Sequence, residues 1–124
     1  MSRKPIVLIV HADAEMRGVL FSLLDRAGYL AGTCASGIDA LKYVAEARPD
    51  AVLCGSRLMD MEGRELLSKV RSMAPVTRLI LLGGAGDSGR PEMSGESPIE
   101  VLHRPVCGPE ILTILQTMTI ESAA

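Results

Sequence analysis

The sequence predicts an α/β domain in which a parallel five-stranded sheet carries helices on both faces. Short apolar runs alternate five times with stretches of helical spacing, which is the pattern of strand–helix units in parallel sheets. The strongest runs are apolar at every position, as is typical of strands buried on both faces. The chain has 124 residues, enough for one core. We therefore expect a single domain over residues 1–124, with its core from about residue 5 to about residue 120.

The first strand is predicted at Ile6–Val10. Asp13 stands where a helix N-cap is expected, because its carboxylate can accept a hydrogen bond from a first-turn N–H group. The helix that follows is expected to end near Gly28. Its apolar positions are Met16, Leu20, Leu23, Leu24 and Ala27. Leu30–Ala35 is a weaker apolar run, so we expect an edge strand there.

The second predicted helix begins after Ser36 and ends at Pro49, because proline cannot continue a regular helix. Its apolar face is predicted to comprise Ile38, Leu41, Val44 and Ala45. Ala51–Cys54 is the third predicted strand. The turn-rich segment Gly55–Gly63 then leads to a third helix, whose apolar positions are Leu66, Leu67 and Val70.

The fourth and fifth strands are predicted at Leu79–Leu82 and Ile99–Leu102. Between them, Gly83–Pro98 is rich in glycine and has little apolar periodicity, so the fourth helix is expected to be shortened or disordered. A last helix is predicted to open at Pro109, a residue type favoured in a first helical turn. Its apolar positions are Ile111, Leu112, Leu115 and Met118.

Composition excludes several classes of function. A net charge of −2 provides no basic face for nucleic acid. No apolar run reaches the roughly 18 residues that cross a bilayer, and the run near the N-terminus is too short for a signal peptide. We therefore expect a cytoplasmic protein with neither a nucleic-acid nor a membrane partner. Cys34, Cys54 and Cys107 lack the spacing of a disulfide framework or zinc site, and Cys54 is predicted to be a buried apolar side chain.

Ligands of parallel α/β sheets bind outside the carboxyl ends of the strands. The segments predicted at that edge are His11–Asp13, Gly55–Met59, Gly83–Gly84 and His103–Pro105. Two histidines at neighbouring strand ends raise the possibility of a metal site. A third ligand is missing, however, so we interpret them as polar residues of the crevice rim.

Three stretches of this layout resemble a known family. Ile6–Val10 with the polar triplet after it, Pro49–Cys54 followed by Arg57–Gly63, and Val101–Pro105 resemble the first, third and fifth strands of response-regulator receiver domains. The resemblance extends from Ile6 to about Met118. It implies a CheY-like, flavodoxin-like fold and a place in bacterial two-component phosphorelay signalling.

The receiver family transfers a phosphoryl group from a histidine kinase to an aspartate. The resemblance places the Mg²⁺-binding acidic pair at His11 and Ala12, and the phosphoacceptor at Gly55. Glycine has no carboxylate to phosphorylate, and Mg²⁺ is usually held by one or two carboxylates. The sequence therefore predicts that Mg²⁺ binding and phosphorylation are lost, and no other cofactor is expected.

The remaining site positions of the family are also changed. The hydroxyl residue after the fourth strand falls on Gly83, and the aromatic switch residue falls on Val101. The lysine of the Lys-Pro step falls on Arg104, which is followed by Pro105, so only a positive charge persists.

Asp13, Asp60 and Ser56 lie close in the sequence to the positions that lack a carboxylate. Asp13 is better explained as a helix cap, and Asp60 as a solvated loop residue rather than a metal ligand. Ser56 is a weak surrogate phosphoacceptor. None of them restores the chemistry of the family.

We therefore predict a pseudo-receiver that is not an enzyme. It is expected to act through phosphorylation-independent contacts with a protein partner in a signalling pathway, with a weak homodimer through the fifth strand and last helix as a further option. The alternative is a small-ligand or anion (nucleotide) sensor in the crevice around Gly83–Gly86 and Arg104, because glycines let backbone N–H groups approach a phosphate. An active receiver with unusual chemistry is a third hypothesis.

Overall fold

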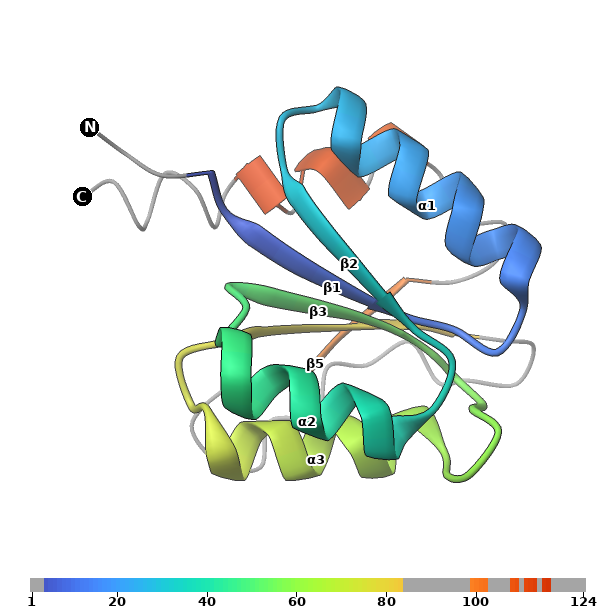
Figure 1. The fold of residues 1–124 in the computed structure, drawn as a ribbon, viewed down its shortest axis with the longest axis vertical. Coiled ribbons are helices and arrows are strands. Elements are labelled where there is room, and N and C mark those ends of the chain that lie inside the picture. The colour runs from blue at the N-terminus through green and yellow to red at the C-terminus, as the bar shows by residue number, and fades with distance from the viewer. Residues whose placement is uncertain (1–3, 84–98, 103–107, 110, 114, 117–124) are drawn as a thin grey trace.

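The computed structural model describes residues 4–83, 99–102, 108–109, 111–113 and 115–116, with only the backbone described at 99–101. Strands alternate with helices through this part of the chain (Figure 1). The elements are β1 (Ile6–Val10), α1 (Ala14–Arg26), β2 (Leu30–Cys34), α2 (Gly37–Ala47), β3 (Ala51–Gly55), α3 (Gly63–Met73), β4 (Arg78–Leu82) and β5 (Ile99–Leu102). Residues 108–109, 111–113 and 115–116 are also helical.

The strands form one parallel sheet in the order β2-β1-β3-β4-β5. This confirms the predicted parallel α/β sheet. The observed order is β2-β1-β3-β4, and β5 lies beside β4. The weak second strand lies at the edge of the sheet, as expected. Val10 pairs with both Cys34 and Cys54, and Gly55 pairs with Leu82. The carboxyl ends of β1, β3 and β4 therefore lie side by side.

Alternating side chains of the buried strands feed two separate apolar layers. Val7 and Ile9 of β1 pack with α1 and with the helical residues Ile111 and Leu115. The intervening residues Leu8 and Val10 pack with α2 and α3 on the opposite face (Figure 1). A strand buried on both faces needs an apolar residue at every position, which is why these runs are continuous in the sequence.

The caps of the first two helices follow the predicted local pattern. The Asp13 Oδ1 accepts a hydrogen bond from the Glu15 N–H (3.0 Å), and the Ser36 Oγ accepts one from the Asp39 N–H (3.2 Å). Gly28 lies one residue beyond the C-cap of α1 and has a φ of +95°, a conformation that glycine adopts readily. The helices therefore begin and end close to the positions that the sequence predicts.

The buried face of α2 differs from the prediction. Gly37, Ala40 and Val44 are buried, whereas Ile38 is 55% exposed and Ala45 is also exposed. The buried stripe begins one residue earlier than predicted, because Gly37 packs under the Met61 side chain and Ala40 lies in the core layer. Ala27 of the first helix is exposed as well.

The segment between β4 and β5 and the lengths of the helices bear on two further expectations. The segment Gly84–Pro98, where a shortened or disordered helix was predicted, lies outside the described residues, as does Met118. Within the part of the chain that the structure describes, no helix is long and apolar enough to cross a membrane.

Candidate functional site

The candidate site lies at the carboxyl edge of the sheet, where β3 ends at Gly55 and where His11 and Gly83 directly follow β1 and β4. Backbone hydrogen bonds continue the sheet beyond these ends. The His11 N–H donates to the Cys34 carbonyl (3.1 Å), and the Gly83 N–H donates to the Leu102 carbonyl (2.7 Å). The structure thus brings together the positions that the resemblance assigns to the acidic pair, the acceptor and the hydroxyl residue.

The imidazole of His11 covers Gly55. A Cβ atom added to Gly55 would lie 2.9 Å from Cδ2 and 3.2 Å from Nε2 of His11. Carbon atoms in van der Waals contact lie about 3.5 to 4.0 Å apart, so any side chain at position 55 requires the ring to move. The His11 ring therefore fills the space beside Gly55, the position to which the resemblance assigns the phosphoacceptor.

Two polar contacts of the loop after β1 involve His11. Its Nδ1 accepts a hydrogen bond from the Asp13 N–H (3.1 Å), so this nitrogen carries no proton in that contact. The Arg17 Nη1 donates to the carbonyls of His11 (2.7 Å) and Ala12 (3.2 Å). A guanidinium thus binds the loop to which the resemblance assigns the metal-binding acids. Sequence analysis did not predict this role of Arg17, because no local sequence pattern predicts a contact between a guanidinium and loop carbonyls.

Helix α3 begins directly against the end of β3. A Cβ atom on Gly63 would collide with the Gly55 carbonyl oxygen and would lie 2.9 Å from Cδ1 of Leu81. The Gly63 N–H donates to the Ser56 carbonyl (2.9 Å), which closes the loop between them. This edge of the sheet is therefore packed tightly around the backbone of Gly55.

Asp60 does not behave as a free loop carboxylate. Its Oδ1 accepts a hydrogen bond from the Gly37 N–H (2.7 Å), and its Oδ2 accepts one from the Ile38 N–H (3.0 Å). The hydrogen bond from Gly37, followed by that from Ile38, lowers the pKa of Asp60 below its ordinary value. The carboxylate is exposed, as expected, but it serves as a cap of α2. Because the contact joins residues 23 positions apart, the sequence carried no signal for it.

The groups at this edge do not fit Mg²⁺. The three positions assigned to carboxylates hold an imidazole, a methyl group and a hydrogen atom, at His11, Ala12 and Gly55. Mg²⁺ is a hard cation that prefers oxygen ligands in octahedral geometry. The nearby Asp13 and Asp60 carboxylates are engaged in helix caps. Among the described residues, no group of three or more His, Cys, Asp or Glu residues could hold a metal ion.

The thiol of Cys54 is fully buried in the layer shared with α2 and α3. Burial raises the pKa of Cys54 to about 12. This confirms the interpretation of Cys54 as a buried apolar side chain rather than a reactive group. The half-buried Cys34 also has a raised pKa, chiefly because of burial and then because of the nearby Asp39 carboxylate.

Several predicted site residues lie outside the described part of the chain. The side chain of Val101 is among them, although the backbone of Val101 in β5 pairs with Leu81 of β4. Arg104, Pro105, Gly84 and Gly86 are also outside it. Their assignments remain predictions.

Comparison with known proteins identifies the family of the chain. The response regulator receiver domain family matches residues 7–115. Sporulation initiation phosphotransferase F of Bacillus subtilis is 30% identical over 81 residues, which cover 65% of each chain. Chemotaxis protein CheY of Thermotoga maritima is 30% identical over 81 residues, covering 64% of this chain and 68% of the relative.

A solved structure, that of a response regulator receiver domain protein from Clostridium thermocellum, has a TM-score of 0.86. It covers 96% of this chain and 97% of its own, at 18% identity, so it supports the fold alone. The chain spans only 17 to 30% of the length of several longer curated relatives. The match over residues 7–115 shows that this chain belongs to the response regulator receiver domain family of two-component signalling.

Proposed function

We propose that this receiver domain is an interaction module that does not accept a phosphoryl group. The observation that carries the proposal is the imidazole of His11, which occupies the space beside Gly55 where an acceptor side chain would stand. In this proposal the domain is not an enzyme and does not bind Mg²⁺. It binds a protein partner of a signalling pathway through the surface of its folded state.

Charge and packing at the carboxyl edge support this proposal. Phosphoryl transfer to an aspartate needs a carboxylate acceptor and a metal ion to neutralise the phosphoryl oxygens. Here the loop after β1 offers the imidazole of His11 and, on its carbonyls, the guanidinium of Arg17. A fixed cation beside the assigned metal position repels a divalent cation rather than attracting it.

The alternative of an anion sensor has less support. It needs free backbone N–H groups after β4, and the Gly83 N–H is already bonded to the Leu102 carbonyl at 2.7 Å. The other residues that it invokes lie outside the described part of the chain. The sensor and the weak homodimer through β5 and the last helix remain predictions.

The proposal is tested by incubating the full chain with acetyl phosphate and Mg²⁺ and measuring its intact mass. We expect no phosphoryl adduct and no change of melting temperature with Mg²⁺ and beryllofluoride. A receiver that has its aspartate is the positive control for the reagents. A phosphoryl adduct on the wild-type chain would overturn the proposal.

A matched variant separates missing ligands from a damaged fold. The triple substitution His11→Asp, Ala12→Asp and Gly55→Asp restores three carboxylates and removes the imidazole that covers position 55. We expect the melting temperature of this variant, unlike that of the wild type, to rise when Mg²⁺ is added, because the cation relieves repulsion among the carboxylates. An equal response of the two proteins to Mg²⁺ would contradict the assignment of these positions.

A further inference from the structure

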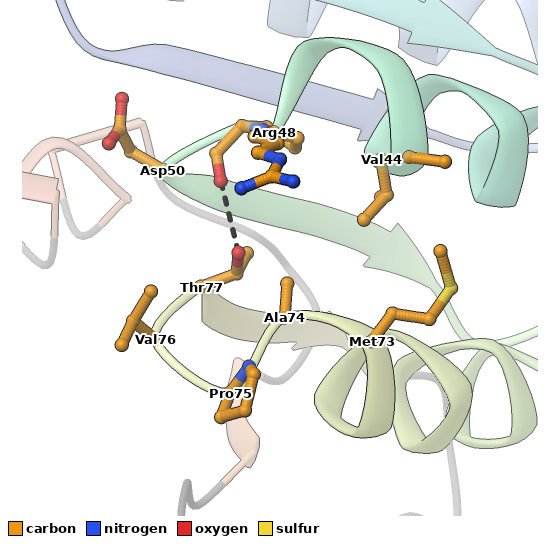
Figure 2. Close-up of a pocket in the computed structure, with 10 residues that line it drawn as sticks. Val44, Arg48, Asp50, Met73, Ala74, Pro75, Val76 and Thr77 are labelled. Atoms are coloured by element: carbon orange, nitrogen blue, oxygen red, sulfur yellow. Dashed lines mark hydrogen bonds between the residues drawn. The ribbon is translucent and has the colours of Figure 1, made fainter.

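A second hollow lies at the opposite edge of the sheet, at the amino ends of β3 and β4. We call it the amino-edge pocket. It is bounded by Val44 and Arg48 at the end of α2, by Met73 at the end of α3, and by Val76 and Thr77 in the turn that follows (Figure 2). Its volume is about 590 Å³. Sites that bind ligands usually measure about 300 to 1,000 Å³. The pocket is therefore large enough to receive one or two side chains of another molecule.

The floor of the amino-edge pocket is fixed by hydrogen bonds. The buried Thr77 hydroxyl donates to the Pro49 carbonyl (3.1 Å). The Arg78 N–H donates to the Asp50 carbonyl (2.9 Å), and the Asp50 N–H donates to the Ile6 carbonyl (2.8 Å). Because these bonds join three separate parts of the chain, the pocket is preformed and binding need not order its floor.

The wall formed after α3 is apolar and open to solvent. Val76 is 97% exposed, and Met73 is 48% exposed. A small molecule held on the floor of the pocket would leave most of Val76 in water. A polypeptide segment that crosses the pocket would cover both side chains, and exposed apolar patches of this kind often mark interaction sites.

The two charged residues that line the pocket, Arg48 and Asp50, differ in the direction of their side chains. Arg48 is the one cationic side chain among the residues that line it, and its guanidinium extends from the end of α2 toward Thr77 in Figure 2. The Asp50 Oδ2 instead accepts a hydrogen bond from the Ile6 N–H (2.8 Å), and the carboxylate points away from Met73 in Figure 2. An anionic group of a partner would therefore meet Arg48 without facing Asp50.

The backbone at Arg48 supplies an independent observation. Arg48 has a φ of 49° and is the only non-glycine residue with positive φ in the described part of the chain. Glycine is the residue that fits a left-handed helix cap with least strain. An arginine at this position strains the backbone, but it supplies a guanidinium that glycine cannot.

We infer that the amino-edge pocket docks a segment of a protein partner in which an aliphatic side chain stands next to a carboxylate. The aliphatic side chain covers Val76 and Met73, and the carboxylate pairs with Arg48. This inference rests on the proposed function, because it names the surface and the chemistry of the partner of a receiver that acts by protein contacts.

The test titrates the isotope-labelled full chain with three short peptides and follows its backbone amide signals. Each peptide has a leucine and an isoleucine separated by a glutamate, a glutamine or a lysine, with glycine and serine on both sides. We expect the glutamate peptide to bind about twofold to fivefold more tightly than the glutamine peptide, as for an exposed ion pair, and the lysine peptide to bind most weakly. The shifted signals should lie in 44–48 and 73–77, and added salt should reduce the preference.

Substitutions in the chain separate binding from folding. Arg48→Gly should abolish the preference for glutamate while the melting temperature holds or rises, because the strain at the cap is relieved. Val76→Ser should weaken all three peptides alike, since the side chain is exposed and its loss does not disturb the core. The matched control is Val19→Ser on α1, where Val19 is 59% exposed, and it should change no affinity.

Five outcomes would overturn the inference, and the first four concern the peptides and the Arg48→Gly variant. They are equal affinity for the three peptides, signal shifts in another part of the chain, absence of saturable binding, and an unchanged preference in Arg48→Gly. A fifth is that octanoate displaces the glutamate peptide at an equal concentration, which would assign the pocket to small acids. The titration uses no phosphodonor and the mass experiment uses no peptide, so either proposal can fail without the other.

Discussion

The two ends of β3 differ in how they meet the rest of the molecule. At the carboxyl end, Gly55 is buried under the His11 ring and against Gly63. At the amino end, Asp50 borders an open pocket with an exposed apolar wall at Val76. Hydrogen bonds hold the backbone at both ends, but the His11 ring closes the space beside Gly55, whereas Arg48 and Val76 line open space at the amino end.

Under the proposed function, this difference accounts for a receiver fold that is kept without phosphoryl transfer at the carboxyl edge. When a carboxylate is absent from the end of a strand, the space must be filled, because interiors are packed to high density. Here the imidazole of His11 fills it, and the loop is fastened by Arg17. A surface used for binding has the opposite requirement and must stay open, as the amino-edge pocket does.

The largest expected effect comes from adding one atom at the carboxyl end of β3, which we call the closed end because the His11 ring and Gly63 enclose Gly55. Gly63→Ala places a Cβ atom against the Gly55 carbonyl, so we expect it to lower the free energy of unfolding by up to about 3 kcal/mol. Gly18→Ala is the matched control, because a Cβ atom there meets nothing within 4 Å. The control should stabilise α1 by about 0.5 to 1 kcal/mol. Urea denaturation measures both, and an equal effect of the two substitutions would show that the closed end is not tightly packed.

A smaller effect concerns the contact between His11 and Gly55. Gly55→Ala should cost about 1 kcal/mol or more in the wild-type background, because its Cβ atom lies too close to the ring. In a His11→Ala background the same substitution should be tolerated, which gives a coupling free energy of about 1 kcal/mol between the two positions. The four proteins of this cycle are compared by urea denaturation. Additive effects would contradict the packing of the ring on Gly55.

The smallest effect concerns Asp60, which ties the loop of the closed end to α2. Its pKa is lower in the folded chain than in the unfolded chain, so its stabilising effect is complete above the unfolded value of about 4 and is lost as the pH falls through the folded value. The stability difference between the wild type and Asp60→Asn should therefore be constant near neutral pH and shrink in acid. Urea denaturation across that pH range measures it. A difference independent of pH would show that the carboxylate does not cap α2.

The elements of this fold could be predicted from sequence where their signals are local. The continuous apolar run Ile6–Val10 became β1 without adjustment, and the caps at Asp13 and Ser36 act on residues two and three positions away. The predicted start of the buried stripe of α2 was wrong by one residue, because the burial of Gly37 depends on a long-range contact with Met61. Local chemistry fixes the element, but not its rotation on the sheet.

The site was predicted only as a set of positions. The sequence placed His11 and Gly55 at one edge, but nothing in it showed that the ring would cover the glycine. Asp60 caps α2 from a distant part of the sequence, and Arg17 binds a carbonyl of the irregular loop after β1. No spacing rule predicts either contact. The amino-edge pocket was missed for the same reason, since it forms where the ends of two helices meet.

The buried thiol of Cys54 has a consequence for the kinetics of this domain. With a pKa of about 12 and no solvent access, it is neither ionised nor reachable at neutral pH while the sheet is closed. Alkylation of Cys54 must therefore pass through states in which α2 and α3 move away from the sheet, because the thiol lies in the layer that these helices cover. The rate of that modification, compared with the rate for the half-buried Cys34, reports how often the core of the sheet opens to water.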